Sequence, residues 1–328
     1  MSGPAGPGRP GTAGPPHEGA APLPPKVDLS VSLAGVCLPN PVMPASGTFE
    51  PFGDTGAPFP LEALGAIVNK TVFWKPRPGN PPPRIQETPS GMLNSIGIPS
   101  RGVERFVAEE LPKMTALGIP VIVSIAGESA AEFRRVARRV EQAGGADLLE
   151  LDLSCPNLRS GVVWAADRRL LGKVIAGVRE AVRLPIVAKL SPSVTDIGAM
   201  AEAAERAGAS ALSLVNTFRG MAIDIRSRRP VLGNVTGGLS GPAIRPLAVY
   251  AVWACYPRVS VPIIGMGGIT GWQDAVEFIL AGATAVAVGT WNFVEPDGMR
   301  RIVEGLAAYV DGQGLPAVRE LIGAAHRP

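Results

Sequence analysis

Cysteine and histidine often supply a nucleophile, a general base or a metal ligand near neutral pH. The two histidines of the 328 residues, His17 and His326, stand close to the two chain ends. We expect neither to lie in a folded segment, which disfavours a Ser-His-Asp triad and a histidine-ligated metal. The three cysteines are widely spaced and predict neither a disulfide framework nor a four-thiolate cluster. We interpret Cys37 and Cys255 as packing residues, which leaves Cys155 for chemistry.

Cys155 lies in the segment Ser154–Asn157, directly after an apolar run of strand type. Pro156 fixes its own φ and has no N–H, so the chain leaves the strand rigidly. With no histidine available, Cys155 is the candidate general base or acid. A nearby lysine such as Lys70 or Lys189 would favour its thiolate.

Small polar and charged residues stand at the end of each apolar run. They are Ala45-Ser46-Gly47, Asn69-Lys70-Thr71, Ser124, Asp152 through Asn157, Lys189, Asn216-Thr217, Gly267-Gly268 and Gly289-Thr290. The carboxyl ends of parallel barrel strands meet on one rim, so these groups are expected to converge. The last two runs carry GMGGI and AVGTW, whose glycines let backbone N–H groups approach a ligand closely. They predict a phosphate, carried by a substrate or by a nucleotide cofactor such as FMN.

The elements that must position these residues alternate between strand and helix. The apolar runs cover 40–49, 65–72, 120–127, 148–157, 185–192, 211–217, 262–269 and 285–291, with helical stretches at 130–145, 170–182, 197–209 and 272–283. Most runs are continuous, which is typical of parallel strands buried on both faces. Eight strands in about 300 residues predict an α/β fold, a (β/α)8 TIM barrel. A doubly wound sheet would open on G-x-G-x-x-G, but ASGTF stands there instead.

Composition divides the chain into a tail and one folded domain. Proline and glycine make up 14 of the first 25 residues, so residues 1–26 are predicted to be a disordered tail and residues 27–328 a single catalytic domain. The net charge is +3 without a basic block, which gives no support for nucleic-acid binding. No apolar run approaches the roughly 20 residues of a membrane span, and no secretory signal is present. Sparse cysteines suit a reducing cytoplasm.

Two long segments rich in Pro, Gly and Asn, 79–101 and 236–242, are predicted to be binding loops. Within the first, Asn94 through Ile98 could present an amide, a hydroxyl and backbone N–H groups to a small polar ligand.

Taken together, these motifs resemble class 1 dihydroorotate dehydrogenases, and within them the catalytic subunit of the NAD-linked class 1B enzymes. The matching pieces, in the family's order from about residue 28 to 310, are ASGTF, NKT, GNPPPRI, GMLNSIGI, SCPN, KLSP, GGLSGPAI, GMGGI and VGT. GNPPPR with GMLNSIGI, and SCPN, are the most specific of them. A class 2 enzyme would carry Ser in place of Cys155 and an N-terminal membrane helix.

The resemblance implies a set of site residues. FMN would be held by Ala45, Ser46, Gly47, Lys70, Thr71, Ser124, Asp152, Lys189, Val215, Gly241, Gly267, Gly268, Gly289 and Thr290. The pyrimidine would be held by Lys70, Asn94, Ser95, Ile96, Gly97, Ile98, Asp152, Asn157, Asn216 and Thr217. Cys155 would remove the C5 proton of dihydroorotate while hydride leaves C6 for N5 of FMN, and Lys70 would offset developing negative charge.

The resemblance also implies where the electrons go. The chain has no NAD fingerprint and too few cysteines for an iron–sulfur cluster. A partner subunit with FAD and a 2Fe–2S cluster would pass electrons to NAD, within a homodimer core or a heterotetramer.

Two positions depart from the family pattern, since Asp152 and Ser124 stand where the family carries Asn. A carboxylate only accepts hydrogen bonds, whereas an amide also donates. Next to anionic orotate, Asp152 would need a proton or a lysine partner. Two interpretations stay open: a compensated variant with unchanged activity, or a shift in substrate or electron acceptor.

Three alternatives also remain open. A tRNA dihydrouridine synthase would need a basic surface and a further helical domain. A reductase of another pyrimidine is favoured slightly by Asp152. The third is a non-redox phosphate-binding barrel or a catalytically dead binding protein, and a yellow purified protein with flavin absorbance would dismiss it.

Overall fold

The computed structural model describes residues 27–53, 56–154 and 164–327. The predicted tail, residues 1–26, lies outside these ranges, and so do Cys155, Pro156 and Asn157. Ser154 is therefore the described residue nearest to the candidate base.

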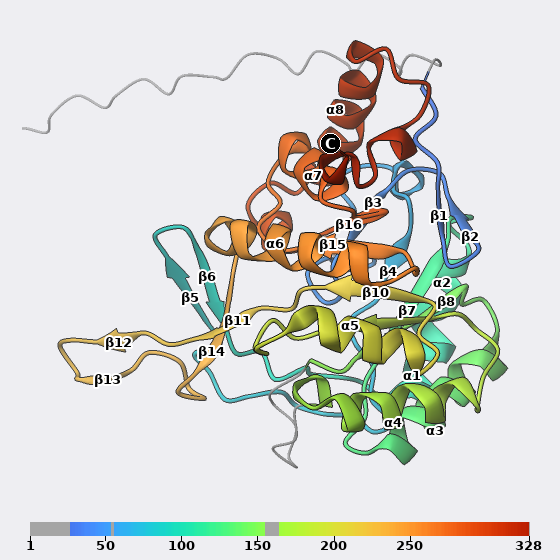
Figure 1. Ribbon diagram of the computed structural model, residues 1–328. Coiled ribbons are helices and arrows are strands. Elements are labelled where there is room, and N and C mark those ends of the chain that lie inside the picture. The colour runs from blue at the N-terminus through green and yellow to red at the C-terminus, as the bar shows by residue number, and fades with distance from the viewer. Residues whose placement is uncertain (1–26, 54–55, 155–163, 328) are drawn as a thin grey trace, which may run out of the picture.

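Eight parallel strands form the centre of the molecule (Figure 1). They are β3 (Val42–Pro44), β4 (Ile67–Val68), β7 (Val121–Ile125), β8 (Leu148–Asp152), β9 (Ile186–Lys189), β10 (Ala211–Leu214), β15 (Ile263–Met266) and β16 (Ala285–Val288). They pair in the order β3-β16-β15-β10-β9-β8-β7-β4. Gly65 N–H donates to Val42 O at 2.8 Å, which brings the two ends of this order together. The result is a nearly closed barrel, and the predicted fold class is confirmed, with one strand in each predicted run.

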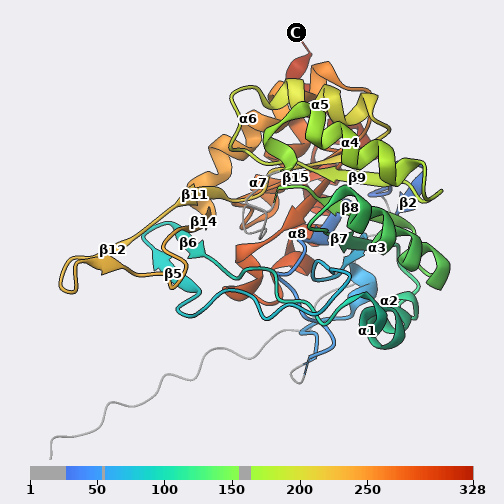
Figure 2. The ribbon, with the colours of Figure 1, turned by 90° about the horizontal axis from the view of Figure 1, so that it is seen from below.

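The main helices lie outside the strands, as Figures 1 and 2 show. They are α3 (Ala130–Ala143), α4 (Arg168–Arg179), α5 (Ile197–Arg206), α6 (Arg245–Cys255), α7 (Trp272–Leu280) and α8 (Gly298–Gly312). A π-helical turn (Phe106–Glu110) separates the short α1 (Val103–Arg105) and α2 (Leu111–Thr115). Further 3-10 turns cover Leu61–Ala63, Trp164–Ala166, Pro242–Ile244, Tyr256–Arg258, Thr290–Phe293, Val318–Leu321 and Ala324–His326. In the described ranges no helix is long and apolar enough to cross a membrane.

Capping residues explain where the outer helices begin and end. Ser129 Oγ accepts the Glu132 N–H at the start of α3, and Asp196 Oδ1 does the same for Ala199 N–H at the start of α5. Gly144 ends α3 as its C-cap with a φ of 73°, a conformation that glycine adopts at little cost. Residues spaced by three and four on α3 face the strands: Phe133, Val136, Ala137 and Val140 are all buried.

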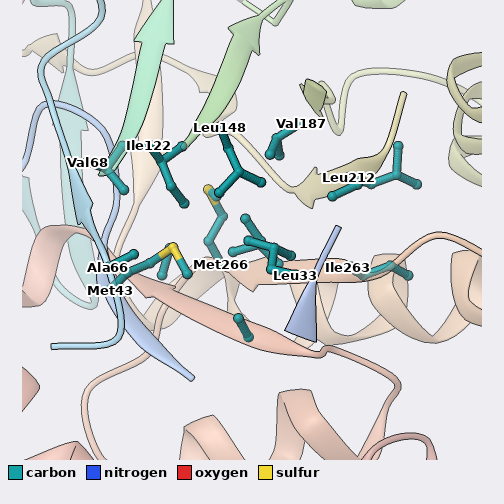
Figure 3. Packing of buried hydrophobic residues seen from close by; sticks show 14 of the residues in the cluster. Leu33, Met43, Ala66, Val68, Ile122, Leu148, Val187, Leu212, Ile263 and Met266 are labelled. Atoms are coloured by element: carbon teal, nitrogen blue, oxygen red, sulfur yellow. The ribbon is translucent and has the colours of Figure 1, made fainter. Parts of the chain in front are cut away.

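The barrel interior is closed by apolar side chains from the strands and from an N-terminal hairpin. This hairpin consists of β1 (Val31–Leu33) and β2 (Val36–Leu38). Figure 3 shows Leu33 among the strand residues Met43, Ile122, Leu148 and Ile263, and all five are at most 1% exposed. The interior is therefore a packed core rather than a channel, and a ligand can enter only beyond the strand ends.

A second, antiparallel sheet is built from segments far apart in the sequence. It consists of β5 (Ile85–Thr88), β6 (Gly91–Asn94), β11 (Phe218–Gly220) and β14 (Gly237–Ser240), in the order β11-β14-β6-β5. A further hairpin, β12 (Ile223–Asp224) with β13 (Arg229–Pro230), projects from it (Figure 1). The segments 79–101 and 236–242 were predicted to be loops. They supply β5, β6 and β14 because strand pairing outweighs their weak β-propensity: β5 pairs with the adjacent β6, and β6 pairs with the distant β14, with Ser240 opposite Met92.

Two expectations about cysteine and histidine were wrong. Cys37 is exposed on β2 and does not pack in the core. His326 is folded: its ring stacks on Trp253 with 3.6 Å between centroids, and its Nε2 lies 3.1 Å from Ala281 O. The last residue of α6, Cys255, is buried as predicted, and its burial raises the thiol pKa from 9.0 to about 12.

We predict that Cys255 does not react with a thiol reagent in the folded protein, because the reagent attacks an exposed thiolate. In a Cys155→Ser variant, which leaves two thiols, Ellman's reagent at pH 8 should release one equivalent quickly from Cys37 and the second only after unfolding. A Cys37→Ser/Cys155→Ser variant serves as control and should release none while folded. Two rapid equivalents from the folded single variant would contradict the burial of Cys255.

Candidate active site

A cavity of about 1280 Å³ opens at the carboxyl ends of the barrel strands, beneath the second sheet. Its wall contains most of the predicted site residues: Ala45, Ser46, Gly47, Lys70, Thr71, Asn94, Ile96, Gly97, Ile98, Asp152, Lys189, Val215, Asn216, Thr217, Gly241, Gly267, Gly268, Gly289 and Thr290. The structure therefore confirms the prediction that residues at the strand ends lie close together, around one cavity. Cys155 and Asn157 lie outside the described residues.

Two of the predicted residues, Ser95 and Ser124, lie behind the cavity wall instead of on it. Ser95 is 2% exposed, and its Oγ accepts a hydrogen bond from Asn80 Nδ2 at 3.0 Å. Ser124 is fully buried, and its Oγ lies 3.0 Å from Thr71 Oγ1. A serine is too short to reach past its neighbours, so Ser124 orders the residues that face the cavity.

One side of the cavity is made of backbone. Gly267 and Gly268 follow β15, Gly289 and Thr290 follow β16, and Gly241 precedes α6. At Gly268 φ is 79°, and an added Cβ would lie 2.9 Å from Gly241 O. This position therefore excludes any side chain, and the wall brings main-chain groups against a ligand as an anion requires.

The Lys70 side chain packs against Gly47 in the cavity wall. An added Cβ on Gly47 would lie 2.7 Å from Lys70 Nζ, so the absence of a side chain at residue 47 makes room for the ammonium group. Both residues line the cavity, one after β3 and the other after β4. The site thus presents a cation to a ligand between the first two barrel strands.

A chain of hydrogen bonds fixes the polar wall beyond β8 and β10. Ser154 Oγ donates to Asp152 Oδ1 at 2.7 Å and accepts from Asn216 Nδ2 at 2.6 Å. Asn216 Oδ1 in turn accepts the Thr217 N–H at 2.7 Å. Because a backbone N–H can only donate, Thr217 fixes which end of the Asn216 amide faces Ser154, and the Ser154 proton then goes to Asp152. Asp152 thus accepts the last hydrogen bond of this chain.

A buried carboxylate beneath the cavity, Glu150, was not predicted from the sequence. It is 3% exposed and lies 3.5 Å from Lys189 Nζ, with Ser124 Oγ at 3.0 Å. The sequence did hold a signal, since Glu150 interrupts the apolar run LLELDL at a position that strand alternation places on the same face as Asp152.

The second sheet contributes further cavity residues that motif reading missed. Glu87, Ser90, Arg219 and Thr236 all line the cavity. Thr290 Oγ1 donates to Ser240 Oγ at 2.8 Å, which ties this sheet to the loop after β16. The cover of the cavity is thereby joined to its glycine wall.

Fold and cavity together define the class: a (β/α)8-barrel protein whose enclosed polar site lies at the carboxyl ends of its strands. A family model for dihydroorotate dehydrogenase matches residues 28–310. The catalytic subunit of dihydroorotate dehydrogenase B (NAD(+)) from Desulforudis audaxviator is 52% identical over 304 residues, covering 92% of this chain and 99% of that relative. The proteins of the same name from Pelobacter propionicus and Geotalea uraniireducens are each 48% identical over 301 residues, covering 91% of this chain and 99% and 98% of theirs. The chain therefore belongs to the dihydroorotate dehydrogenase family, as its motifs indicated.

We predict that Gly268→Ala destabilises the protein more than Gly35→Ala does. Both glycines have positive φ, 79° and 86°, so alanine at either position costs about 1–2 kcal/mol of conformational energy. Around Gly35 an added Cβ meets nothing within 4 Å, whereas at Gly268 it meets backbone. Urea unfolding of the two variants measures the difference, and FMN titration should show weaker binding for Gly268→Ala alone. Equal stability and equal binding of the two variants would contradict the tight glycine wall.

We predict that Asp152→Asn tightens orotate binding by roughly tenfold, equivalent to about 1.4 kcal/mol. The amide oxygen can still accept from Ser154, and one negative charge leaves the cavity that receives an anionic ligand. Titration of the purified protein with orotate measures this, and dihydroorotate turnover should rise in the same variant. Asp152→Ala, which also removes the acceptor for Ser154, is the control and should not tighten binding. Loss of orotate binding in Asp152→Asn would refute this role of the charge.

Proposed function

We propose that this chain oxidises dihydroorotate to orotate in pyrimidine biosynthesis, as the catalytic subunit of an NAD-linked enzyme. One observation carries the proposal: the described strand-end motifs that are typical of the family line a single cavity. The three relatives above bear the name of that catalytic subunit. They match this chain over nearly their whole length, so the matched region spans all of the candidate site.

The volume of the cavity supports the proposal that FMN and a pyrimidine bind in it together. Its volume of about 1280 Å³ exceeds the roughly 300–1,000 Å³ typical of pockets for a single small ligand. The glycine wall, with Gly267, Gly268, Gly289 and Thr290, would hold the phosphate, and Lys189 would lie against the ring system. Bound FMN supplies the hydride acceptor for C6 of dihydroorotate.

The chain's own residues would position the substrate and move its proton. Asn94 and Asn216 would hold the pyrimidine through their amides, and the bonded chain described above already orients the Asn216 side chain. Cys155 would take the proton from C5. Lys70, held over Gly47, would balance negative charge that develops on the substrate.

The electrons would leave through a partner subunit. In the described ranges no group of three His, Cys, Asp or Glu residues is placed to hold a metal, and the three cysteines of the whole chain are fewer than a four-thiolate cluster needs. We propose that a second subunit with FAD and a 2Fe–2S cluster receives the electrons and reduces NAD. A homodimer of this chain would form the core of that assembly.

One anaerobic spectroscopic experiment tests the proposed function. The purified chain should be yellow with one FMN, and dihydroorotate should bleach it whereas dihydrouracil should not. NAD added afterwards to the isolated chain should leave it bleached, because the partner is absent.

Cys155→Ser is the matched control: it should bind FMN normally and bleach at least 100-fold more slowly at pH 7, because serine is a far weaker base. A colourless protein, or bleaching by dihydrouracil alone, would refute the proposed substrate and favour one of the alternatives.

A further inference from the structure

Glu150 is a buried carboxylate that the proposed mechanism does not use. It lies in the middle of β8, and its side chain is 4% exposed. It is two residues before Asp152, so both side chains point to the same face of the strand, with Glu150 one layer deeper in the barrel. An unpaired carboxylate at such a depth would be strongly unfavourable, so its surroundings must compensate it.

Three neighbouring strands supply that compensation. Ser124 Oγ of β7 donates to Oε1 at 3.0 Å, and Ser213 Oγ of β10 donates to Oε2 at 3.1 Å. Lys189 Nζ of β9 lies 3.5 Å from Oε1, and its own side chain is only 7% exposed. Of these partners, Lys189 also lines the cavity. The ammonium group therefore lies between a buried carboxylate and the ligand space.

A series of hydrogen-bonded hydroxyl groups also connects the Glu150 carboxylate to the cavity wall. Ser124 gives its proton to Glu150, so the proton in its 3.0 Å contact with Thr71 Oγ1 comes from Thr71. Thr71 then accepts from Ser46 Oγ at 2.9 Å, and Ser46 shares its proton with Asn69 O, also at 2.9 Å. Thr71 and Ser46 both line the cavity. Hydrogen bonds in such a chain polarise one another, so the charge of Glu150 orients groups that it does not touch.

We propose that Glu150 is a positioning residue that holds the Lys189 ammonium at the cavity floor and balances its charge against the flavin. This inference rests on the proposed FMN site. The positive charge of an ammonium group beside the flavin would stabilise the negative charge that the ring gains on reduction. A carboxylate at 3.5 Å from that ammonium offsets much of this effect in a medium of low dielectric constant. The pair therefore sets the reduction potential of the cofactor lower than Lys189 alone would.

The test is the reduction potential of the flavin in Glu150→Gln, measured at pH 7 by equilibration with a reference dye. The substitution keeps the shape of the side chain and removes its charge. At a fixed dye potential the ratio of reduced to oxidised flavin should rise at least tenfold, which corresponds to about 30 mV for a two-electron couple. A ratio equal to or below that of the parent protein would overturn the proposal.

Two control variants separate the effect of the Glu150 charge from the effects of its hydrogen bonds and of another carboxylate near the cavity. Ser213→Ala removes a hydrogen bond to the same carboxylate without changing any charge. Glu87→Gln removes a carboxylate from the exposed strand face at the cavity rim, where water screens it. Both should keep the parent ratio within threefold, and a Glu87→Gln shift as large as that of Glu150→Gln would overturn the specific role of Glu150.

A double variant covers the case in which Glu150→Gln fails to fold because the Lys189 ammonium loses its buried counter-charge. Glu150→Gln/Lys189→Met removes both buried charges together, which proteins often tolerate. If Glu150 balances Lys189, the flavin ratio of this variant should stay within tenfold of the parent. A fall greater than tenfold would show that Lys189 acts uncompensated, and would overturn the proposal. A parent protein that binds no FMN would instead refute the proposed cofactor site, which distinguishes the two failures.

Discussion

Burial of the barrel strands on both faces is the constraint on which the rest of the structure depends. Strands β7, β8 and β9 are buried along their whole length, inside by the barrel core and outside by helices. Charged side chains can therefore stand only where a strand ends, or where neighbouring strands neutralise them. Lys189 and Asp152 are the last residues of β9 and β8. The cavity therefore forms at the strand ends, where burial on both faces stops.

The polar groups below the cavity follow the same constraint one layer deeper. The barrel interior can hold the Glu150 carboxylate because a lysine and two serines from three other strands pair with it. Above it, Asp152 accepts a hydrogen bond from Ser154, which in turn accepts one from the Asn216 amide on the cavity wall. Thus the two carboxylates of one strand, two residues apart, have different partners: the deeper one pairs with a cation, and the outer one accepts the last hydrogen bond of a chain of donors.

The cover of the cavity has a different physical origin. Its strands are short and several contain glycine, and they gain stability by pairing with one another, locally for β5 with β6 and across a long stretch of sequence for β6 with β14. The same glycines allow close packing: at Gly238 an added Cβ would lie 1.9 Å from Thr217 Oγ1, so a ligand-facing threonine sits against bare backbone. Cover and barrel therefore contribute jointly to a single binding space.

The sequence by itself determined the barrel, the family and most of the cavity wall, because continuous apolar runs and strand-end motifs are local patterns. Residues such as Lys70, Gly268 and Asn216 could be assigned to the wall because strand ends of a parallel barrel must meet. Only the tertiary structure decided that Ser124 lies behind the wall, that His326 stacks in a folded segment and that Glu150 pairs with Lys189. These facts depend on contacts between residues from different strands and helices, and the depth of a side chain and the identity of its neighbours are not encoded in the local order of residues.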